Sequence, residues 1–270
     1  LAWRRSRIGS GREATMGAVR HGGGRRMAWA MLALVAALAA AGCGGPVATK
    51  APAQATLTPT PLPTVRYVAL GASDAVGYGA DQPNSQGYVP LLIARLPKGS
   101  SALNLGILGN TVHPALQNEL PEALAAQPTL VTVWLVGNDF RDCVALADYQ
   151  ADLTTLLATL RAKTSAHIFI ANLPDLTALP VFQNGAAQAG ACWHGMDATA
   201  LRAAVGQWNA AIATVAASQG AYLVDLYHSD LAAHPEFIFR DGFHPSTAGY
   251  AYLASLFWAQ IQAHGGVPAA

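Results

Sequence analysis

The segment Asp241-Gly-Phe-His244-Pro245, close to the C-terminal end of the sequence, combines residue types that could do acid–base chemistry. The Asp-x-x-His spacing can bring the carboxylate against the imidazole ring within one tight turn. The carboxylate would then fix the tautomer of the ring and stabilise its charged form, which leaves the second ring nitrogen to accept a proton. Such a pair could activate a hydroxyl nucleophile. Asp241 could also cap a helix, with His244 packed beside Pro245.

Ser73 is the candidate nucleophile, in the segment Gly71-Ala-Ser-Asp74. The glycine allows a sharp turn at the end of a predicted strand, so that the serine can stand exposed at the edge of a sheet. A Gly-x-Ser after a strand is, by itself, more often an ordinary turn. The Gly-x-Ser-x-Gly elbow of α/β-hydrolases is absent, because Ala75 occupies the position of its second glycine.

Two further segments, each after a predicted strand, could complete such a site. Gly109 lies in Asn104-Leu-Gly-Ile-Leu-Gly-Asn-Thr111, and Asn138 lies in Gly137-Asn-Asp139. Each also has a purely structural interpretation, as a turn glycine and as the side chain of an Asx turn. Four such coincidences, in chain order and at predicted strand ends, favour one shared site over four separate turns.

Short apolar runs of strand-like composition alternate with segments of helical periodicity from residue 65 onward. Helical spacing of apolar residues covers 146–160, 201–215 and 250–261. This alternation predicts an α/β domain over residues 65–270, with three α/β/α layers and a central, mainly parallel five-stranded sheet. Working residues of such sheets lie beyond the C-terminal strand ends. The strands are expected at residues 67–70, 102–105, 130–136, 167–171 and 222–226, with 130–136 apolar enough for a central strand.

Ser73, Gly109, Asn138 and His244 resemble the four residues that name the SGNH, or GDSL-type, hydrolases, and their segments are similar to the first, second, third and fifth blocks of that family. The resemblance extends from residue 65 to about residue 264 and implies the flavodoxin-like SGNH hydrolase fold. It implies that Ser73 attacks a carboxylic ester, with His244 as base and Asp241 orienting it. It also implies an oxyanion hole made by the backbone N–H groups of Ser73 and Gly109 and the side chain of Asn138.

The first block departs from the family pattern, which usually reads Gly-Asp-Ser. Here Ala72 precedes the serine and Asp74 follows it. Neither the nucleophile nor the base is lost, but the local support of the serine loop is left open. Weaker candidates for substrate contact are His113, Asp139 and His194, each of which could instead be structural.

The function implied by the resemblance needs no cofactor, and the histidines show no metal-ligand spacing. Candidate substrates are short acyl esters, O-acetyl groups on polysaccharide and lysophospholipids. The family is so broad that membership in it does not distinguish among these three. Large triglycerides are the least favoured, since no long apolar lid segment lies near the site. We expect a monomer.

Two other functions stay open at this stage. One is a catalytically inactive extracytoplasmic binding protein on the same fold, for which Ala72 is the only support. The other is a different enzyme on a doubly wound sheet, such as a nucleotide-binding protein. The segment Gly77-Tyr-Gly79 lacks the remaining glycine and the lysine of a phosphate loop, which argues against the second.

The N-terminal 43 residues are typical of a secretory signal peptide. Arg25-Arg26 precede the apolar run 27–41, which ends in small residues at Gly42-Cys43. That run is shorter than the ~20 residues of a spanning helix, although a transmembrane anchor is the alternative. The segment around Cys43 resembles a degenerate bacterial lipobox, which implies lipidation of its thiol and a membrane-anchored or secreted location. The Pro-, Thr- and Ala-rich residues 44–64 then form an extended linker.

Charge and cysteine usage agree with this organisation. Seven of the 16 basic residues, but only one of the 15 acidic residues, precede Cys43, so the remainder carries a formal charge of −5. This mildly acidic body has no basic cluster, which argues against a nucleic-acid partner. If Cys43 is lipidated, Cys143 and Cys192 remain as an even pair in an oxidising compartment, where they could form a disulfide or stay as two free thiols.

Overall fold

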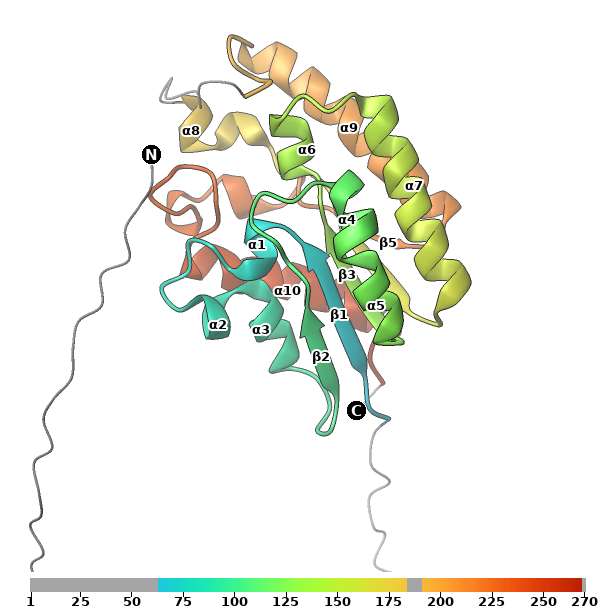
Figure 1. Cartoon of the computed structure of the whole chain (residues 1–270). Coiled ribbons are helices and arrows are strands. Elements are labelled where there is room, and N and C mark those ends of the chain that lie inside the picture. The colour runs from blue at the N-terminus through green and yellow to red at the C-terminus, as the bar shows by residue number, and fades with distance from the viewer. Residues whose placement is uncertain (1–62, 184–190, 269–270) are drawn as a thin grey trace, which may run out of the picture. The chain divides into compact units, whose positions relative to one another are not determined.

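The computed structural model describes residues 63–183 and 191–268. The expected signal peptide, Cys43 and most of the expected linker lie outside the described residues. Five parallel strands form one sheet in the order β2-β1-β3-β4-β5 (Figure 1). Their bounds are β1 Arg66–Gly71, β2 Ser101–Asn104, β3 Leu130–Trp134, β4 His167–Ala171 and β5 Tyr222–Val224.

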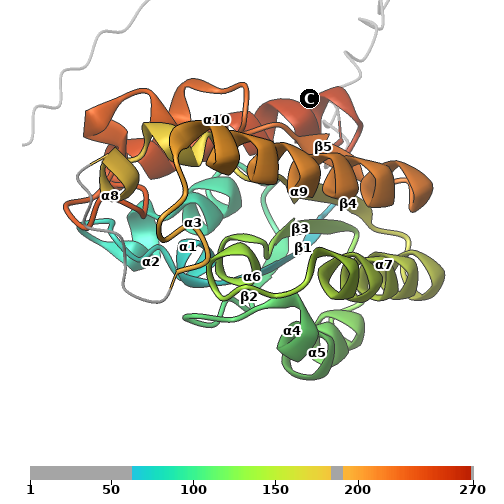
Figure 2. The ribbon, with the colours of Figure 1, turned by 90° about the horizontal axis from the view of Figure 1, so that it is seen from above.

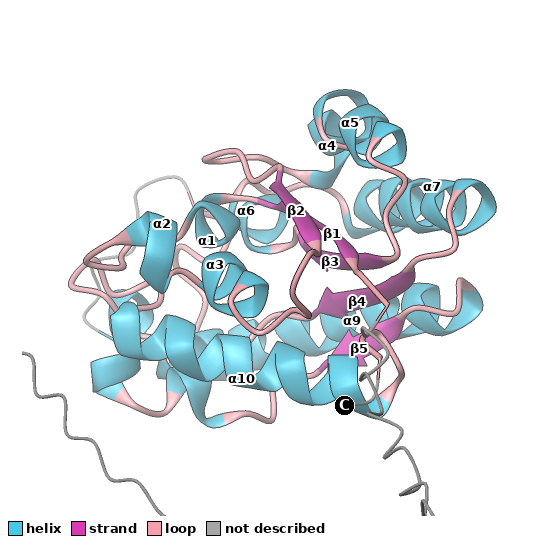
Figure 3. Cartoon of the chain, turned by 90° about the horizontal axis from the view of Figure 1, so that it is seen from below, coloured by secondary structure: helices cyan, strands magenta, loops and turns pink. Residues whose placement is uncertain are grey.

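Helices cover both faces of the sheet, which confirms the predicted three-layer architecture. On one face α3 (Tyr88–Ile93) packs against α10 (Thr247–Ala263). The other face carries α4, α5, α7 and α9, with α7 in contact with the other three (Figure 2 and Figure 3). The bounds on this face are α4 Val112–Asn118, α5 Leu120–Ala125, α7 Leu146–Lys163 and α9 Ala198–Ser218. The short helices are α1 Ser73–Val76, α2 Pro83–Gln86, α6 Gly137–Arg141 and α8 Pro180–Gln183.

The hydrophobic core lies between the sheet and these two helical layers. All five residues of the central strand β3 are buried, as expected for a strand covered on both faces. Helix α7 turns one stripe toward the core, because its buried residues recur every three or four positions at Tyr149, Leu153, Leu156, Leu157 and Leu160. No helix in the described residues is both long and apolar enough to cross a membrane.

Two strands end two residues earlier than the sequence predicts. The runs at 130–136 and 222–226 leave the sheet at Trp134 and Val224. Leu135, Val136 and Leu226 are nevertheless buried. These residues are apolar because the first loop turns beyond each strand lie inside the core. Burial therefore extends the strand-like pattern past the last backbone pairing.

A disulfide joins Cys143, just after α6, to Cys192 in the segment that leads into α9. The two Cα atoms lie 5.1 Å apart, and the cysteines are separated by 49 positions in the chain. The backbone N–H of Cys192 also donates to the carbonyl of Arg141 at 2.9 Å. Cys143 has a φ of 61°, which places a residue with a Cβ in the left-handed region. The disulfide therefore holds a turn in which Cys143 adopts an unfavourable left-handed backbone conformation.

Replacement of both cysteines by serine should lower the free energy of unfolding. Closing a loop of this length stabilises a protein by about 4 kcal/mol in the chain-entropy description. We expect the urea midpoint of the Cys143→Ser/Cys192→Ser variant to fall markedly. The Cys143→Gly/Cys192→Ser variant should recover roughly 1 kcal/mol, because glycine adopts the left-handed conformation without the Cβ penalty. Equal midpoints for the wild type and the serine variant would contradict this prediction.

Candidate active site

Ser73 stands where β1 passes directly into α1. A Cβ atom at Gly71 would lie 2.7 Å from the Cβ of Ala75, so only glycine lets the short helix start against the end of the strand. Ser73 is the first residue of α1 and is 8% exposed. The predicted sharp turn is therefore present, and it presents the serine hydroxyl at the C-terminal edge of the sheet.

His244 and Asp241 meet this serine from the other end of the chain. Ser73 Oγ lies 2.8 Å from His244 Nε2, and His244 Nδ1 lies 2.7 Å from Asp241 Oδ2. The other oxygen, Asp241 Oδ1, accepts the backbone N–H groups of Phe243 at 2.9 Å and His244 at 3.0 Å. An ionised carboxylate only accepts hydrogen bonds, so the neutral ring carries its proton on Nδ1. Nε2 is then free to accept the proton of Ser73.

Asp241 does not cap the last helix, which was its structural alternative. The cap of α10 is Ser246, whose side chain accepts the backbone N–H of Gly249. The imidazole of His244 packs against Tyr78, whose ring meets it edge-on with the two ring centroids 4.7 Å apart. Asp241 is thus left to bind His244, and the ring is held in one orientation.

The charges around His244 favour a basic imidazole. Burial lowers the pKa of His244, but the hydrogen bond to Asp241 and the negative charges of Asp74 and Asp241 outweigh it, so the pKa is raised above its ordinary 6.5. Burial also acts to raise the pKa of Asp241. The hydrogen bonds that it accepts from the His244 ring and from two backbone N–H groups prevail and hold its pKa below the ordinary value. Asp241 is therefore ionised at neutral pH.

Asn138 belongs to α6, the short helix that follows β3, and is 5% exposed. Its Nδ2 donates to the carbonyl of Asn110 at 2.9 Å, which ties α6 to the turn containing Gly109. Gly109 has a φ of 75°, and nothing lies within 4 Å of a Cβ added there. Its conformation, rather than space, therefore requires glycine. The structure brings Asn138 to the serine side of the site and links the Gly109 turn to it through Asn110.

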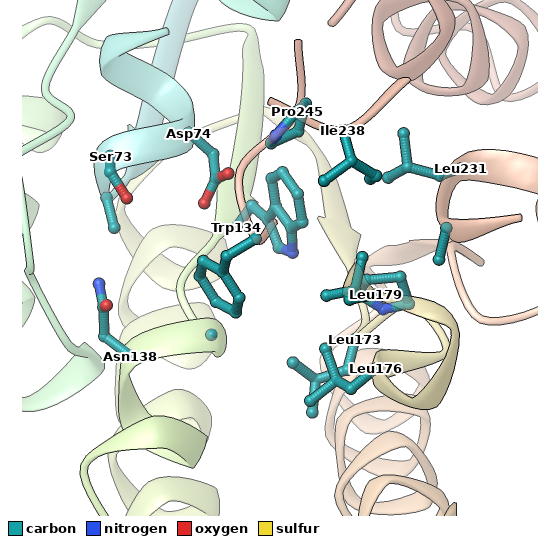
Figure 4. Close-up of a pocket in the computed structure, with 15 residues that line it drawn as sticks. Ser73, Asp74, Trp134, Asn138, Leu173, Leu176, Leu179, Leu231, Ile238 and Pro245 are labelled. Atoms are coloured by element: carbon teal, nitrogen blue, oxygen red, sulfur yellow. The ribbon is translucent and has the colours of Figure 1, made fainter. Parts of the chain in front are cut away.

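A pocket opens beside the serine and is lined mainly by apolar side chains. Ser73, Asp74 and Asn138 form its polar side, and Figure 4 shows the Ser73 hydroxyl and the Asn138 amide pointing toward each other. The carboxylate of Asp74 points into the same space, toward Trp134. Burial raises the pKa of Asp74, although the neighbouring His244 opposes this. The apolar wall includes Leu173, Leu176, Leu179, Leu231 and Ile238.

A second Asp-x-x-His pair, Asp225 and His228, follows β5. It repeats the carboxylate–imidazole contact, with Asp225 Oδ2 at 2.6 Å from His228 Nδ1. The His228 side chain is 77% exposed, against 16% for His244. No serine, threonine or cysteine of the described residues hydrogen bonds to its ring. The sequence motif alone therefore marks two pairs, and only one of them faces a hydroxyl.

The weaker candidates do not line the pocket. His113 is largely exposed and bonds Asp152, and His194 is also exposed. Asp139 is 1% exposed and accepts the backbone N–H of Val112, so its role is structural. Within the described ranges, no three His, Cys, Asp or Glu side chains are grouped so that they could hold a metal ion.

Sequence reasoning missed Glu119, a fully buried carboxylate next to the serine turn. Its Oε2 accepts the backbone N–H of Gly71 at 2.8 Å. One signal could have found it: Ala115, Glu119 and Ala123 recur every four residues on the buried side of consecutive helices. A charged residue at an apolar helical position is a candidate for a specific polar contact.

Comparisons with known proteins identify a family for this chain. Residues 69–252 match the GDSL-like Lipase/Acylhydrolase family model. A comparison with curated protein sequences finds no match.

Similar solved structures include a lipase/acylhydrolase from Enterococcus faecalis (22% identity, 74% of this chain and 96% of that chain, TM-score 0.56). They also include Axe2, an acetylxylan esterase from Geobacillus stearothermophilus (18% identity, 78% of this chain and 100% of that chain, TM-score 0.57). A third is an extracellular lipase from Streptomyces rimosus (18% identity, 73% of this chain and 100% of that chain, TM-score 0.55). At these identities the likeness shows the shared fold. Because the family match spans more than half of the sequence, the chain belongs to the GDSL-like lipase/acylhydrolase family of ester hydrolases.

Proposed function

We propose that the protein hydrolyses carboxylic esters through an acyl-enzyme on Ser73, with His244 as general base and acid and Asp241 orienting it. The observation that carries the proposal is the unbroken line of hydrogen bonds from Asp241 through His244 to the Ser73 hydroxyl. A half-buried imidazole of raised pKa, pointing its unprotonated nitrogen at a serine, is the arrangement that general-base activation requires.

The reaction runs in two halves. Ser73 Oγ attacks the ester carbonyl while His244 Nε2 takes the hydroxyl proton. The tetrahedral oxyanion then collapses, the bond to the alcohol oxygen breaks, and His244 returns the proton to the departing alcohol. Water, giving its proton to His244, next attacks the acyl-serine. The bond to Ser73 breaks, its oxygen recovers the proton, and the carboxylic acid leaves.

The negative charge that develops on the carbonyl oxygen needs fixed donors. We assign this role to the backbone N–H groups of Ser73 and Gly109 and to the side chain of Asn138. The amide of Asn138 has two N–H bonds, of which one goes to the Asn110 carbonyl, so the second remains for the oxyanion. Losing one such donor typically costs about 2.7–4 kcal/mol of transition-state stabilisation.

The substrate is proposed to be a small ester whose apolar part enters the leucine-lined pocket. Short acyl esters, O-acetyl groups of polysaccharide and lysophospholipids all meet this description. Among the similar structures, one is named an acetylxylan esterase and another a lipase, so their names do not choose one of these substrates. An inactive binding protein is disfavoured, because a binding site has no need of an imidazole held against a hydroxyl.

The proposed location is extracytoplasmic, with the domain tethered as a monomer through a lipid on Cys43. The signal-peptide pattern and the Cys143–Cys192 disulfide, a bond typical of oxidising compartments, support this location. Mass spectrometry of the mature N-terminus should find a diacylated Cys43. A mature protein that begins elsewhere with an unmodified residue would contradict the anchor and leave the esterase proposal untouched.

Removal of the nucleophile or the base should abolish turnover. We expect Ser73→Ala and His244→Ala each to lower kcat for p-nitrophenyl esters by on the order of 10⁴-fold or more, because the remaining groups cannot form the acyl-enzyme. His228→Ala is the matched control, since His228 occupies the same kind of Asp-x-x-His turn away from the serine. A Ser73→Ala variant that keeps wild-type activity would refute the assignment. So would failure of a fluorophosphonate to label Ser73.

The acid limb of the pH–rate profile should report His244. A protonated ring cannot accept the serine proton, so activity falls as the pH drops through the pKa of His244, which lies above 6.5. Asp74→Asn removes one of the charges that raise this pKa. We therefore expect the limb to move to lower pH, as measured by kcat/KM between acidic and neutral pH. Asp225→Asn should leave the limb in place, and a limb unmoved in Asp74→Asn would contradict the coupling.

A further inference from the structure

We propose that Glu119 is a positioning residue that holds the serine turn and the oxyanion-hole turn in register with each other. The inference rests on the proposed ester hydrolysis at Ser73. Glu119 touches neither the substrate pocket nor the reacting atoms, and it would act through the backbone segments that it joins.

The two oxygens of this carboxylate bind two different segments of the site. Oε2 accepts the backbone N–H of Gly71, the last residue of β1, two positions before Ser73. Oε1 accepts the side-chain amide of Asn110, which directly follows Gly109. Glu119 sits between α4 and α5 with no solvent exposure. One rigid, buried group therefore sets the spacing between the nucleophile turn and the glycine turn.

Asn110 extends this connection to the third proposed donor. Its backbone carbonyl accepts the side-chain N–H of Asn138 at 2.9 Å. Glu119 thus binds Gly71, two positions before Ser73, and Asn110, which is next to Gly109 and one further hydrogen bond from Asn138. A shift of Asn110 would move Gly109 and turn the Asn138 amide together.

A carboxylate at position 119 also compensates for Ala72, which stands where the family usually has an aspartate before the serine. Ala72 offers no polar side chain to support the serine turn, and Glu119 delivers its oxygen to the N–H of the preceding residue instead. Burying an acid without solvent is costly and is tolerated only where its oxygens are hydrogen-bonded. Burial raises the pKa of Glu119 to about 7 even with both donors in place. A buried carboxylate that destabilises the fold, and whose hydrogen bonds go only to Gly71 and Asn110, is explained by its fixing the positions of these two residues.

The test is the near-isosteric Glu119→Gln variant, assayed with p-nitrophenyl butyrate. A glutamine amide has one acceptor oxygen, so either Gly71 or Asn110 would face an N–H group. Misplaced oxyanion donors reduce the stabilisation of the transition state and leave substrate binding largely unchanged. We expect kcat to fall on the order of 10²-fold while KM stays close to the wild-type value. Active sites are counted with a fluorophosphonate, so that only folded enzyme enters kcat.

Two further variants separate positioning from general damage to the core. Thr132→Val removes another buried polar contact, the hydrogen bond to Tyr67, and should keep wild-type kcat. Asn110→Asp combined with Glu119→Gln reverses the pair, since the glutamine amide can donate to the new carboxylate while its oxygen accepts Gly71. This double variant should recover much of the lost kcat.

Each outcome decides a different claim. Wild-type kcat in Glu119→Gln, or no recovery in the double variant, would overturn the role of Glu119 while the esterase function stands. A wild type that neither turns over esters nor reacts with the probe would overturn the proposed function itself. Should Glu119→Gln fail to fold, Asn110→Ala cuts the same connection from the other side. A reduced kcat would support the inference there, and an unchanged kcat would overturn it.

Discussion

The hydrogen bond between Ser73 and His244 joins side chains that are 171 positions apart in the chain, and the rest of the site depends on it. Hydrogen bonds weaken steeply as their geometry is distorted, so both backbone segments must be fixed within a fraction of an ångström. The parallel sheet fixes only one of them. Ser73 follows β1 directly, whereas His244 lies in a long connection between β5 and α10, where no strand end holds it.

The second segment is fixed by contacts between the turn after α1 and the start of α10. The Tyr250 hydroxyl donates to the carbonyl of Tyr78 at 2.6 Å, and Thr247 hydrogen bonds both the backbone and the side chain of Asp81. Gly79, at a φ of 102°, lets the turn approach the chain so closely that a Cβ would lie 2.5 Å from the Pro245 carbonyl. Gly79, one of the two glycines of the incomplete phosphate-loop pattern, thus allows the serine and histidine segments to pack together, whereas Gly77 packs against Pro83 and Gly87.

The sequence predicts the parts of this molecule that depend on local pattern. Alternating strands and helices predict the parallel sheet, and the apolar run at 130–136 predicts its central strand. The site is harder to predict, because contacts across the fold decide it. The Asp-x-x-His spacing alone does not separate 225–228 from 241–244; the family resemblance selects the second pair, and the structure shows that the first is exposed. Glu119 is harder still, since its partners are 48 and 9 positions away and one is a backbone N–H.

The carboxylates around the site differ in pKa because their surroundings differ. Asp241 accepts three hydrogen bonds that hold its pKa low, whereas burial raises the pKa values of Asp74 and Glu119. The acid that follows the serine, rather than preceding it, projects into the pocket and tunes His244, so it cannot also support the serine turn. Glu119 supports the serine turn instead, from the junction between α4 and α5. Restoring an aspartate at position 72 would therefore not simply repair the family pattern, because Ala72 is 4% exposed and lines the same pocket as Asp74, so a second carboxylate would be buried there. The two departures from the usual block are best understood as one rearrangement, in which the support of the nucleophile has moved from the serine turn itself to a distant, buried acid.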